Sequence, residues 1–387
     1  MVTISCSSKF HAFALAEQME KHGLLKDLYT TYAYKKNTFM RRFVSRNDKE
    51  NIPPEKTHTL VPLAVAMKLM SGENYWQSWN NLFDKWVAKQ IANKKDYNIF
   101  IGWSGMSLQA LRAAKANGKT IILERGSAHI QYQNNILKDE YRRFGSDFKI
   151  DPKTIEKELA EYEEADYISI PSSFAKQSFL EHGVAENKLI VNPYGTSSFF
   201  QKEKTGEKKR PFRVLYLGSL IIRKGMYYLF EALKQIKIPD TKLEAWFIGK
   251  VDNEIKPLVE KYAQPNWTFF GHVNHYDLAR YISACDVAVV PSLEDGYGMV
   301  VPQMLACGVP VISSANTGGK DTIEEGKNGF IIPIRDPEAI AEKIRLLYGD
   351  RSRLEEMKSA ALHSKRENLS WDSYGERYAG FINSIKK

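Results

Sequence analysis

Short apolar runs alternate with amphipathic stretches of helical period along the first half of the chain. An apolar run of about four to eight residues predicts a buried strand, and apolar positions recurring every three or four residues predict a helix. Strands are expected at Val2–Ser7, Leu28–Ala33, Tyr97–Trp103, Thr120–Glu124, Asp166–Ser172 and Lys188–Asn192, and helices at Ala12–His22, Ser107–Ala116 and Ser173–His182. This βα rhythm predicts a mostly parallel sheet with helices on both faces.

A polar break divides the chain near its middle. Residues 197–210 (SSFFQKEKTGEKKR) are charged and aperiodic and are followed by Pro211, so they predict a linker. The alternation then restarts, with strands expected at Phe212–Leu217, Leu243–Ile248, Trp267–Phe270, Val287–Val290, Val309–Ser313 and Phe330–Pro333, and helices at Met226–Ile236, Pro337–Tyr348, Arg351–Glu367 and Trp371–Ile385. We therefore predict two doubly wound α/β domains, at 1–196 and 212–370, joined by a linker at 197–211. The C-terminal helix at 371–387 is expected to pack back on the N-terminal domain.

The positive charge belongs to one part of the chain. Residues 1–150 hold 23 Lys and Arg against 13 Asp and Glu, whereas the remainder holds 32 against 33. Such asymmetry indicates either an anionic partner of the N-terminal part, such as a phospholipid surface or a phosphorylated acceptor, or a contribution to solubility alone. Nucleic acid is the weakest option, because no nucleic-acid-binding motif accompanies the charge.

Several classes of protein and site are not expected. No apolar run approaches the roughly 20 residues that span a bilayer, and the N-terminus lacks the layout of a secretory signal. The three cysteines are far apart in the sequence and match neither a disulfide framework nor a metal site, which favours a cytoplasmic location. With no Asp-x-Asp motif and no His/Cys cluster, we expect no metal and no cofactor.

The stretch Val287–Gly308 (VAVVPSLEDGYGMVVPQMLACG) carries the most chemistry. A buried strand runs into an acidic loop, and a helix is expected to begin near Gly298 or Met299. Glycines in the loop let the backbone approach a ligand, and the N–H groups of a helix start bind phosphate. Glu294 and Asp295 stand beside this position, where a carboxylate accepts hydrogen bonds from sugar hydroxyls.

This stretch resembles the donor-binding region of glycosyltransferase family 4. The family pattern is Pro-Ser, E-G-[FY]-G, a second glutamate eight residues after the first, and A-C-G-x-P-V. The chain has Pro291-Ser292, Gly296-Tyr297-Gly298 and Ala306–Val311 in register. The resemblance implies a retaining enzyme of the GT-B fold, in which two Rossmann-like domains face each other across a cleft. A nucleotide sugar would bind the C-terminal domain and an acceptor the N-terminal one.

The resemblance also implies the donor-site residues. Lys224, in the run VLYLGSLIIRKG, falls on the lysine that neutralises the donor diphosphate. The loop Phe270–Val273 resembles the one that contacts the nucleobase. The implied donor-binding residues are Gly218, Ser219, His272, Val273, Glu294, Gly296, Tyr297, Gly298, Met299, Val300 and Gln303, beside Arg223, Lys224 and Asp295, which we expect to act in catalysis.

Three positions depart from the family pattern. Asp295 replaces the glutamate that contacts the transferred sugar, and Glu294 beside it is an alternative contact. Gln303 replaces the glutamate that holds the ribose, which weakens that hydrogen bond because it is no longer charge-assisted. Ser219 stands where relatives carry an arginine, and Arg223 is expected to supply that positive charge.

The N-terminal domain offers fewer signals. His129 lies in the loop after the strand Thr120–Glu124, and in relatives a histidine of a similar loop points into the cleft; the alternative is an ordinary loop histidine. His11, Glu124 and Arg125 are further acceptor-side candidates. The aromatic stretch Tyr75–Ile91 and the basic run Lys35–Arg46 form either a membrane-docking face or, for the aromatics, part of the core.

The resulting hypothesis is a retaining, metal-independent glycosyltransferase. It would transfer a sugar from a UDP- or GDP-type donor to a glycan or lipid-linked acceptor, anionic if the basic charge serves binding, in bacterial surface polysaccharide or glycolipid synthesis. The expected location is the cytoplasm, including peripheral contact with the inner face of the membrane. Alternatives are a nucleotide-sugar epimerase of the same fold and a non-catalytic nucleotide-sugar-binding relative.

Overall fold

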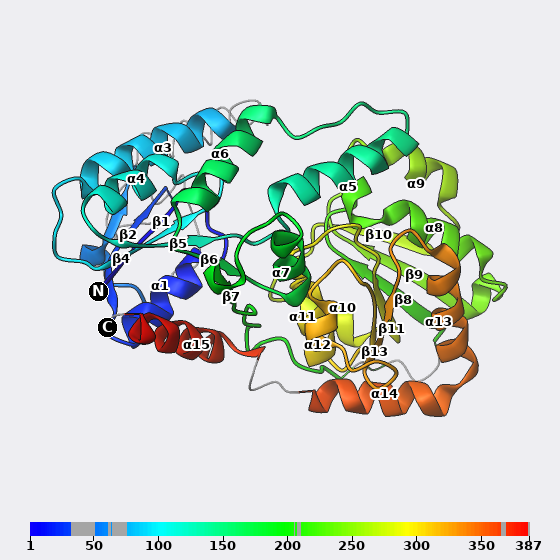
Figure 1. Ribbon diagram of the computed structural model, residues 1–387. Helices are drawn as coiled ribbons and strands as arrows, with labels where there is room; N and C mark the ends of the chain where they lie inside the picture. Colours follow the sequence, from blue (N-terminus) through cyan, green and yellow to red (C-terminus); the bar gives the residue numbers. More distant parts are fainter. Residues whose placement is uncertain are drawn as a thin grey trace.

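Two parallel sheets organise the chain (Figure 1). The computed structural model describes residues 1–31, 51–60, 63, 76–204, 206, 210–364 and 369–385. The first sheet has the order β3-β2-β1-β4-β5-β6-β7. Its strands are β1 (Val2–Cys6), β2 (Leu25–Thr30), β3 (Thr57–Thr59), β4 (Ile99–Trp103), β5 (Thr120–Glu124), β6 (Tyr167–Ile170) and β7 (Leu189–Val191).

The second sheet has the order β10-β9-β8-β11-β12-β13. Its strands are β8 (Phe212–Leu217), β9 (Leu243–Ile248), β10 (Trp267–Gly271), β11 (Val287–Val290), β12 (Val311–Ser314) and β13 (Gly329–Ile332). In both sheets the strand order reverses beside the first strand, which is the Rossmann arrangement, and ligands of such sheets bind at the carboxyl ends of the strands at this switch point. The prediction of two doubly wound domains is confirmed.

Helices cover both faces of each sheet. In the N-terminal half they are α1 (Ala12–Lys21), α3 (Trp76–Ile91), α4 (Leu108–Ala116), α5 (Ile130–Arg143), α6 (Pro152–Glu164) and α7 (Ser173–Leu180). The later helices are α8 (Met226–Gln235), α9 (Lys256–Tyr262), α10 (Leu278–Ser283), α11 (Val300–Ala306), α12 (Gly319–Thr322), α13 (Pro337–Gly349), α14 (Arg351–His363) and α15 (Trp371–Ser384). The sequence patterns did not predict α5, α6 or β3.

Helix α15 packs on the N-terminal domain beside α1 (Figure 1). Lys21 pairs with Asp372 at 2.8 Å, and the buried Tyr378 hydroxyl donates to Glu124 Oε1 at 2.7 Å. The chain passes between the domains twice, and the two passages lie side by side because Thr196 bridges to Ser370.

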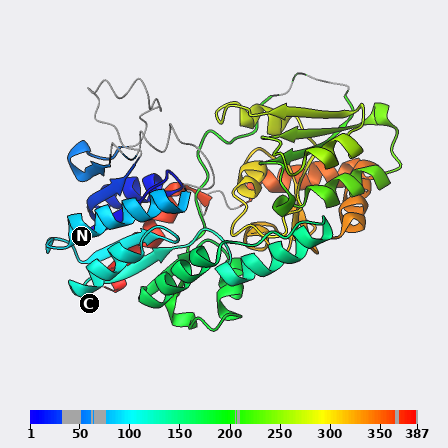
Figure 2. The same cartoon turned by 90° about the horizontal axis from the view of Figure 1, so that it is seen from above.

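Helix α5 begins in the N-terminal domain and extends onto the C-terminal domain (Figures 1 and 2). Its residues Ile136, Tyr141 and Phe144 pack against the hydrophobic core of the C-terminal domain. Its buried Glu140 accepts hydrogen bonds from Tyr228 at 2.8 Å and from Arg335 at 2.7 Å. Helix α5, from the N-terminal half of the chain, and helix α15, from its C-terminal end, therefore both hold the two domains together.

The aromatic face of α3 is mostly part of the core. Phe83 is fully buried, whereas Trp79 and Trp86 are partly buried against the same cluster and Trp76 is 43% exposed. The basic run Lys35–Arg46 lies outside the described residues. Among the described residues, no helix is both long and apolar enough to cross a membrane.

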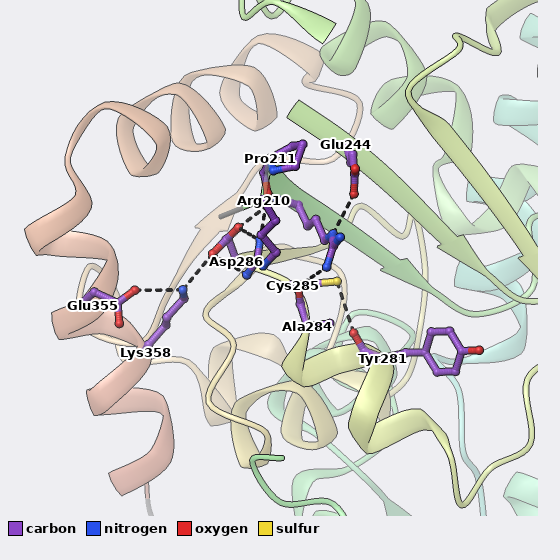
Figure 3. Close-up of polar contacts among 10 residues, drawn as sticks. Arg210, Pro211, Glu244, Tyr281, Ala284, Cys285, Asp286, Glu355 and Lys358 are labelled. Carbon is purple, nitrogen blue, oxygen red and sulfur yellow. Dashed lines mark hydrogen bonds and ion pairs between the residues drawn. The ribbon is translucent and has the colours of Figure 1, made fainter. Parts of the chain in front are cut away.

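A buried carboxylate joins the end of the linker to the C-terminal domain (Figure 3). Asp286 lies just before β11 and accepts from Arg210 Nη1 at 2.6 Å, from Lys358 of α14 at 2.9 Å and from the backbone N–H of Arg213 at 2.9 Å. Burial raises the pKa of Asp286, whereas Arg210 and Lys358 lower it. The effect of the two cations is the larger, so the pKa of Asp286 lies below its usual value. This cluster is at the amino ends of the strands, opposite to the edge where ligands bind.

Candidate functional site

Two loops meet at the switch point of the second sheet. One follows β8 and leads through the short helical turn Ile222–Lys224 into α8; the other follows β11 and leads into α11. The Leu293 N–H donates to Arg223 O at 3.0 Å, which joins the two loops through the backbone. The carboxyl ends of β8 and β11 thus bring together the residues that the sequence placed 71 positions apart.

Two cations face two carboxylates across these loops. Lys224 Nζ donates to Asp295 Oδ2, and Arg223 Nη1 donates to Glu294 Oε2 at 3.1 Å. Burial alone would raise the pKa of Asp295. Lys224 and Arg223 lower this pKa by more than burial raises it, so it lies below its usual value and Asp295 is ionised at neutral pH. The side chains of Lys224 and Asp295 remain 18% and 21% exposed, so a ligand can reach this pair.

Glu294 is not available to a sugar. Its side chain is fully buried and accepts hydrogen bonds from the Ala128 N–H at 3.0 Å and from Gln133 Nε2 at 2.9 Å, besides Arg223. Ala128 and Gln133 belong to the N-terminal domain. The suggestion that Glu294 contacts the transferred sugar is therefore corrected: its carboxylate joins the two domains, and Asp295 is the accessible one.

Gly296 and Tyr297 also serve the domain interface. A Cβ atom on Gly296 would lie 2.2 Å from Gly126 O, so the N-terminal domain occupies the space a side chain would need. The Tyr297 ring is buried in the hydrophobic cluster of the N-terminal domain, and its hydroxyl donates to Tyr194 O at 3.1 Å. We predicted that these residues line the donor site, but they pack against the other domain. Gly298 has φ +69°, which glycine adopts without strain, and its N–H bonds to Asp295.

The remaining donor-side candidates lie around the same edge. Met299 and Val300 are partly buried at the start of α11, which begins one or two residues later than predicted, and Gln303 is 8% exposed in that helix. Gly218 is partly buried at the end of β8, whereas Ser219 after it is exposed. In the loop after β10, His272 is exposed and Val273 packs against the core.

His129 was predicted to point into the cleft between the domains, but its side chain is enclosed. It is 2% exposed, caps the N-terminus of α5 by accepting from the Gln131 N–H at 3.3 Å, and stacks on His182 with ring centres 4.4 Å apart. Burial, and then the nearby His182 and Arg125, lower the pKa of His129 to about 3. A neutral, enclosed imidazole stabilises α5, and we do not retain it as a catalytic residue.

The other N-terminal candidates are paired inside the domain. His11 Nε2 lies 2.8 Å from Glu124 Oε2, and its ring packs on Tyr194 with centres 4.1 Å apart. Arg125 pairs with Glu158 at 2.8 Å and donates to Gln133 Oε1 at 3.0 Å. His11 lies in the loop after β1, and Glu124 and Arg125 lie at the carboxyl end of β5; each of the three side chains has a partner inside the domain.

Sequence reasoning missed the N-terminal side of the interface. Gln133 on α5 and Ser172 before α7 bond to Glu294 and to Gly296 O respectively, and Tyr132 accepts from Asn316 at 3.0 Å. A polar residue on a helix carries no motif, so only the position of α5 against the loop after β11 reveals these roles. Across the described ranges, no group of His, Cys, Asp or Glu side chains is arranged to hold a metal ion.

Comparison with known proteins agrees with the two-domain fold described above. Residues 197–364 match the family model of the glycosyl transferases group 1. The capsular polysaccharide biosynthesis glycosyltransferase CapM of Staphylococcus aureus is 30% identical over 203 residues, covering 48% of this chain and 53% of CapM. The chain therefore spans about half the length of this curated relative.

Solved structures match over nearly the whole chain. Sucrose-phosphate synthase from Thermosynechococcus elongatus superimposes with a TM-score of 0.75 at 18% identity, covering 99% of this chain and 98% of the synthase. HepE of Anabaena, solved in complex with UDP-glucose, superimposes with a TM-score of 0.71 at 16% identity, covering 99% of each chain. These likenesses show that the fold is GT-B.

Proposed function

We propose that this chain is a retaining glycosyltransferase that transfers a sugar from a nucleotide sugar to a glycan or lipid-linked acceptor. The observation that carries the proposal is the accessible Lys224–Asp295 pair, with Arg223 beside it, at the switch point of the second sheet. The family match over residues 197–364 supports the reaction class, and the UDP-glucose complex of HepE supports a nucleotide-sugar donor.

The two cations and the carboxylate have separate tasks in this proposal. A departing nucleoside diphosphate develops negative charge, and fixed cations at Lys224 and Arg223 stabilise it without reorganisation. When the diphosphate takes Lys224, Asp295 is released from that ion pair and can accept hydrogen bonds from the hydroxyls of the transferred sugar. The departing phosphate oxygen assists deprotonation of the acceptor hydroxyl on the same face, which gives retention and uses no metal, cofactor or protein nucleophile.

The acceptor belongs to the N-terminal domain in this proposal. The carboxyl ends of β1 and β4 form the switch point of the first sheet. The loop after β4 lies near the loop after β11, because Met106 and Tyr297 belong to one hydrophobic cluster. The excess positive charge of residues 1–150 favours an acceptor with an anionic group. CapM, a capsular polysaccharide enzyme, supports synthesis of a surface polysaccharide or glycolipid.

Lys224→Ala tests the donor site. The unmodified protein should show a raised melting temperature with UDP, GDP or one of their sugars, and Lys224→Ala should abolish this shift while its own melting stays cooperative. Lys250→Ala is the matched control, because Lys250 is an 80% exposed lysine of the same domain. An unchanged ligand shift in Lys224→Ala would overturn the assignment. Release of nucleoside diphosphate only when acceptor is present separates transfer from epimerisation.

A further inference from the structure

Glu294 is a fully buried carboxylate placed between two domains. Its Oε1 accepts from the Ala128 N–H at 3.0 Å, and its Oε2 accepts from Gln133 Nε2 at 2.9 Å and from Arg223 Nη1 at 3.1 Å. A buried charge is tolerated only when it is paired and hydrogen-bonded, and here the pairing comes from the C-terminal domain while two of the three hydrogen bonds come from the N-terminal one. Satisfying this carboxylate therefore requires that the domains be together.

We infer that Glu294 is a positioning residue that locks the two domains together and orients Arg223 toward the donor diphosphate. The inference rests on the proposed function for the second part, but the locking itself does not depend on it.

The orientation of Arg223 follows from which of its atoms are engaged. Nη1 donates to the backbone oxygen of Glu294 at 2.9 Å as well as to its carboxylate, so one arm of the guanidinium is held at two points. The Nε and Nη2 groups make no hydrogen bond to any residue of the described ranges, and the side chain is 26% exposed. These donors remain for an anionic ligand beside Lys224.

A chain of alternating partners reaches Glu294 from the N-terminal domain. Glu158 pairs with Arg125, Arg125 donates to Gln133 Oε1, and Gln133 Nε2 donates to Glu294. Gln133 is thus fixed at both ends of its amide, which also sets the direction of that amide. When the domains separate, Arg223 is the only hydrogen-bond partner that Glu294 keeps. The whole negative charge of the carboxylate then acts on the guanidinium that the diphosphate needs.

Three variants test the inference with two measurements. Glu294→Gln keeps the shape but has one acceptor oxygen for three donors. Gln133→Leu removes one of the two N-terminal donors while leaving the Ala128 and Arg223 contacts intact. Asp321→Asn is the control, because Asp321 makes a different interdomain hydrogen bond, to the Ser173 N–H at 2.8 Å, away from Arg223. The measurements are the radius of gyration of the ligand-free protein by X-ray scattering and steady-state kinetics with nucleotide sugar and acceptor.

The two readouts separate the lock from the reaction. We expect Glu294→Gln and Gln133→Leu to enlarge the radius of gyration and Asp321→Asn to leave it unchanged; equal radii for all would overturn the lock. Glu294→Gln should lower kcat about 100-fold, as for a reacting group misplaced by about 1 Å, with the donor KM near its original value. A loss confined to KM would overturn the positioning of Arg223. Absence of transfer in the unmodified protein would refute the proposed function and leave scattering to decide the lock.

Discussion

Substituting Gly296 by alanine should force the two domains apart. The added Cβ would lie 2.2 Å from Gly126 O and 2.6 Å from Ser127 Cα, where ordinary contacts begin at 3.4 Å. Both neighbours are backbone atoms, so no side chain can rotate away, and the loops must separate by about 1.2 Å, the difference between 3.4 and 2.2 Å. Packed interfaces do not absorb such a shift without opening.

The expected consequence is a slower transfer step in a protein that still folds. The displaced loop carries Asp295 and the carboxylate of Glu294, so in the proposed reaction the donor sugar would move relative to the acceptor. A misplacement of about 1 Å costs about 100-fold in rate. We therefore expect kcat for release of nucleoside diphosphate to fall about 100-fold in Gly296→Ala, and the melting of the C-terminal domain to remain close to that of the unmodified protein.

Gly380→Ala is the matched control. Gly380 lies in α15, a Cβ there would meet no atom within 4 Å, and alanine stabilises a helix by about 0.5–1 kcal/mol relative to glycine. Its rate should equal that of the unmodified protein. The reasoning is refuted if Gly296→Ala transfers sugar at the original rate with an unchanged radius of gyration, because the close approach of the two loops would then be unnecessary for the reaction.

Three further predictions concern stability. His129 has a pKa of about 3 in the folded protein against about 6.5 in the unfolded chain, so below pH 6.5 the unfolded chain binds a proton that the folded protein does not. The free energy of unfolding should therefore decline as pH falls below 6.5, by up to about 1.4 kcal/mol per pH unit. His129→Asn, which keeps a capping oxygen, should flatten this slope in urea titrations at several pH values. Tyr378→Phe leaves Glu124 one hydrogen bond short and should lower the free energy of unfolding in urea by about 2 kcal/mol; an unchanged free energy of unfolding would contradict this contact. Asp286→Ala leaves Arg210 and Lys358 without their shared carboxylate and should cost about 3 kcal/mol by the same measurement, whereas Glu355→Ala, at a 68% exposed carboxylate of the same cluster, should cost under about 1 kcal/mol.

Much of the fold was predictable because strands in a parallel sheet buried on both faces are continuous apolar runs. Thr120–Glu124, Phe212–Leu217, Leu243–Ile248 and Val287–Val290 have the bounds that the pattern predicts. The helix α5 was missed because it is strongly polar and divides its few apolar positions between two cores: Ile130 packs in the N-terminal core, whereas Ile136 and Tyr141 pack against the C-terminal one. The Asp151-Pro152 cap of α6 is a local signal that would have revealed that helix.

The candidate donor site was predictable only in part. The motif placed Arg223, Lys224 and Asp295 in loops after neighbouring parallel strands, and such loops meet at one edge of a sheet. It could not tell which loop residues face a ligand and which face the other domain. Glu294 and Asp295 are consecutive, yet one is fully buried against Gln133 and the other is 21% exposed beside Lys224.

The sequence by itself determined the two Rossmann-like domains and the loops that carry charge, because apolar periodicity and turn residues act locally. Only the tertiary structure decided that Glu294, Gly296 and Tyr297 belong to the domain interface and that His129 is enclosed. Their partners in the N-terminal domain lie 103 positions away for Tyr297 and 161 or more for Glu294. No local pattern specifies such contacts, since they depend on how two separately folded sheets are held by α5 and α15.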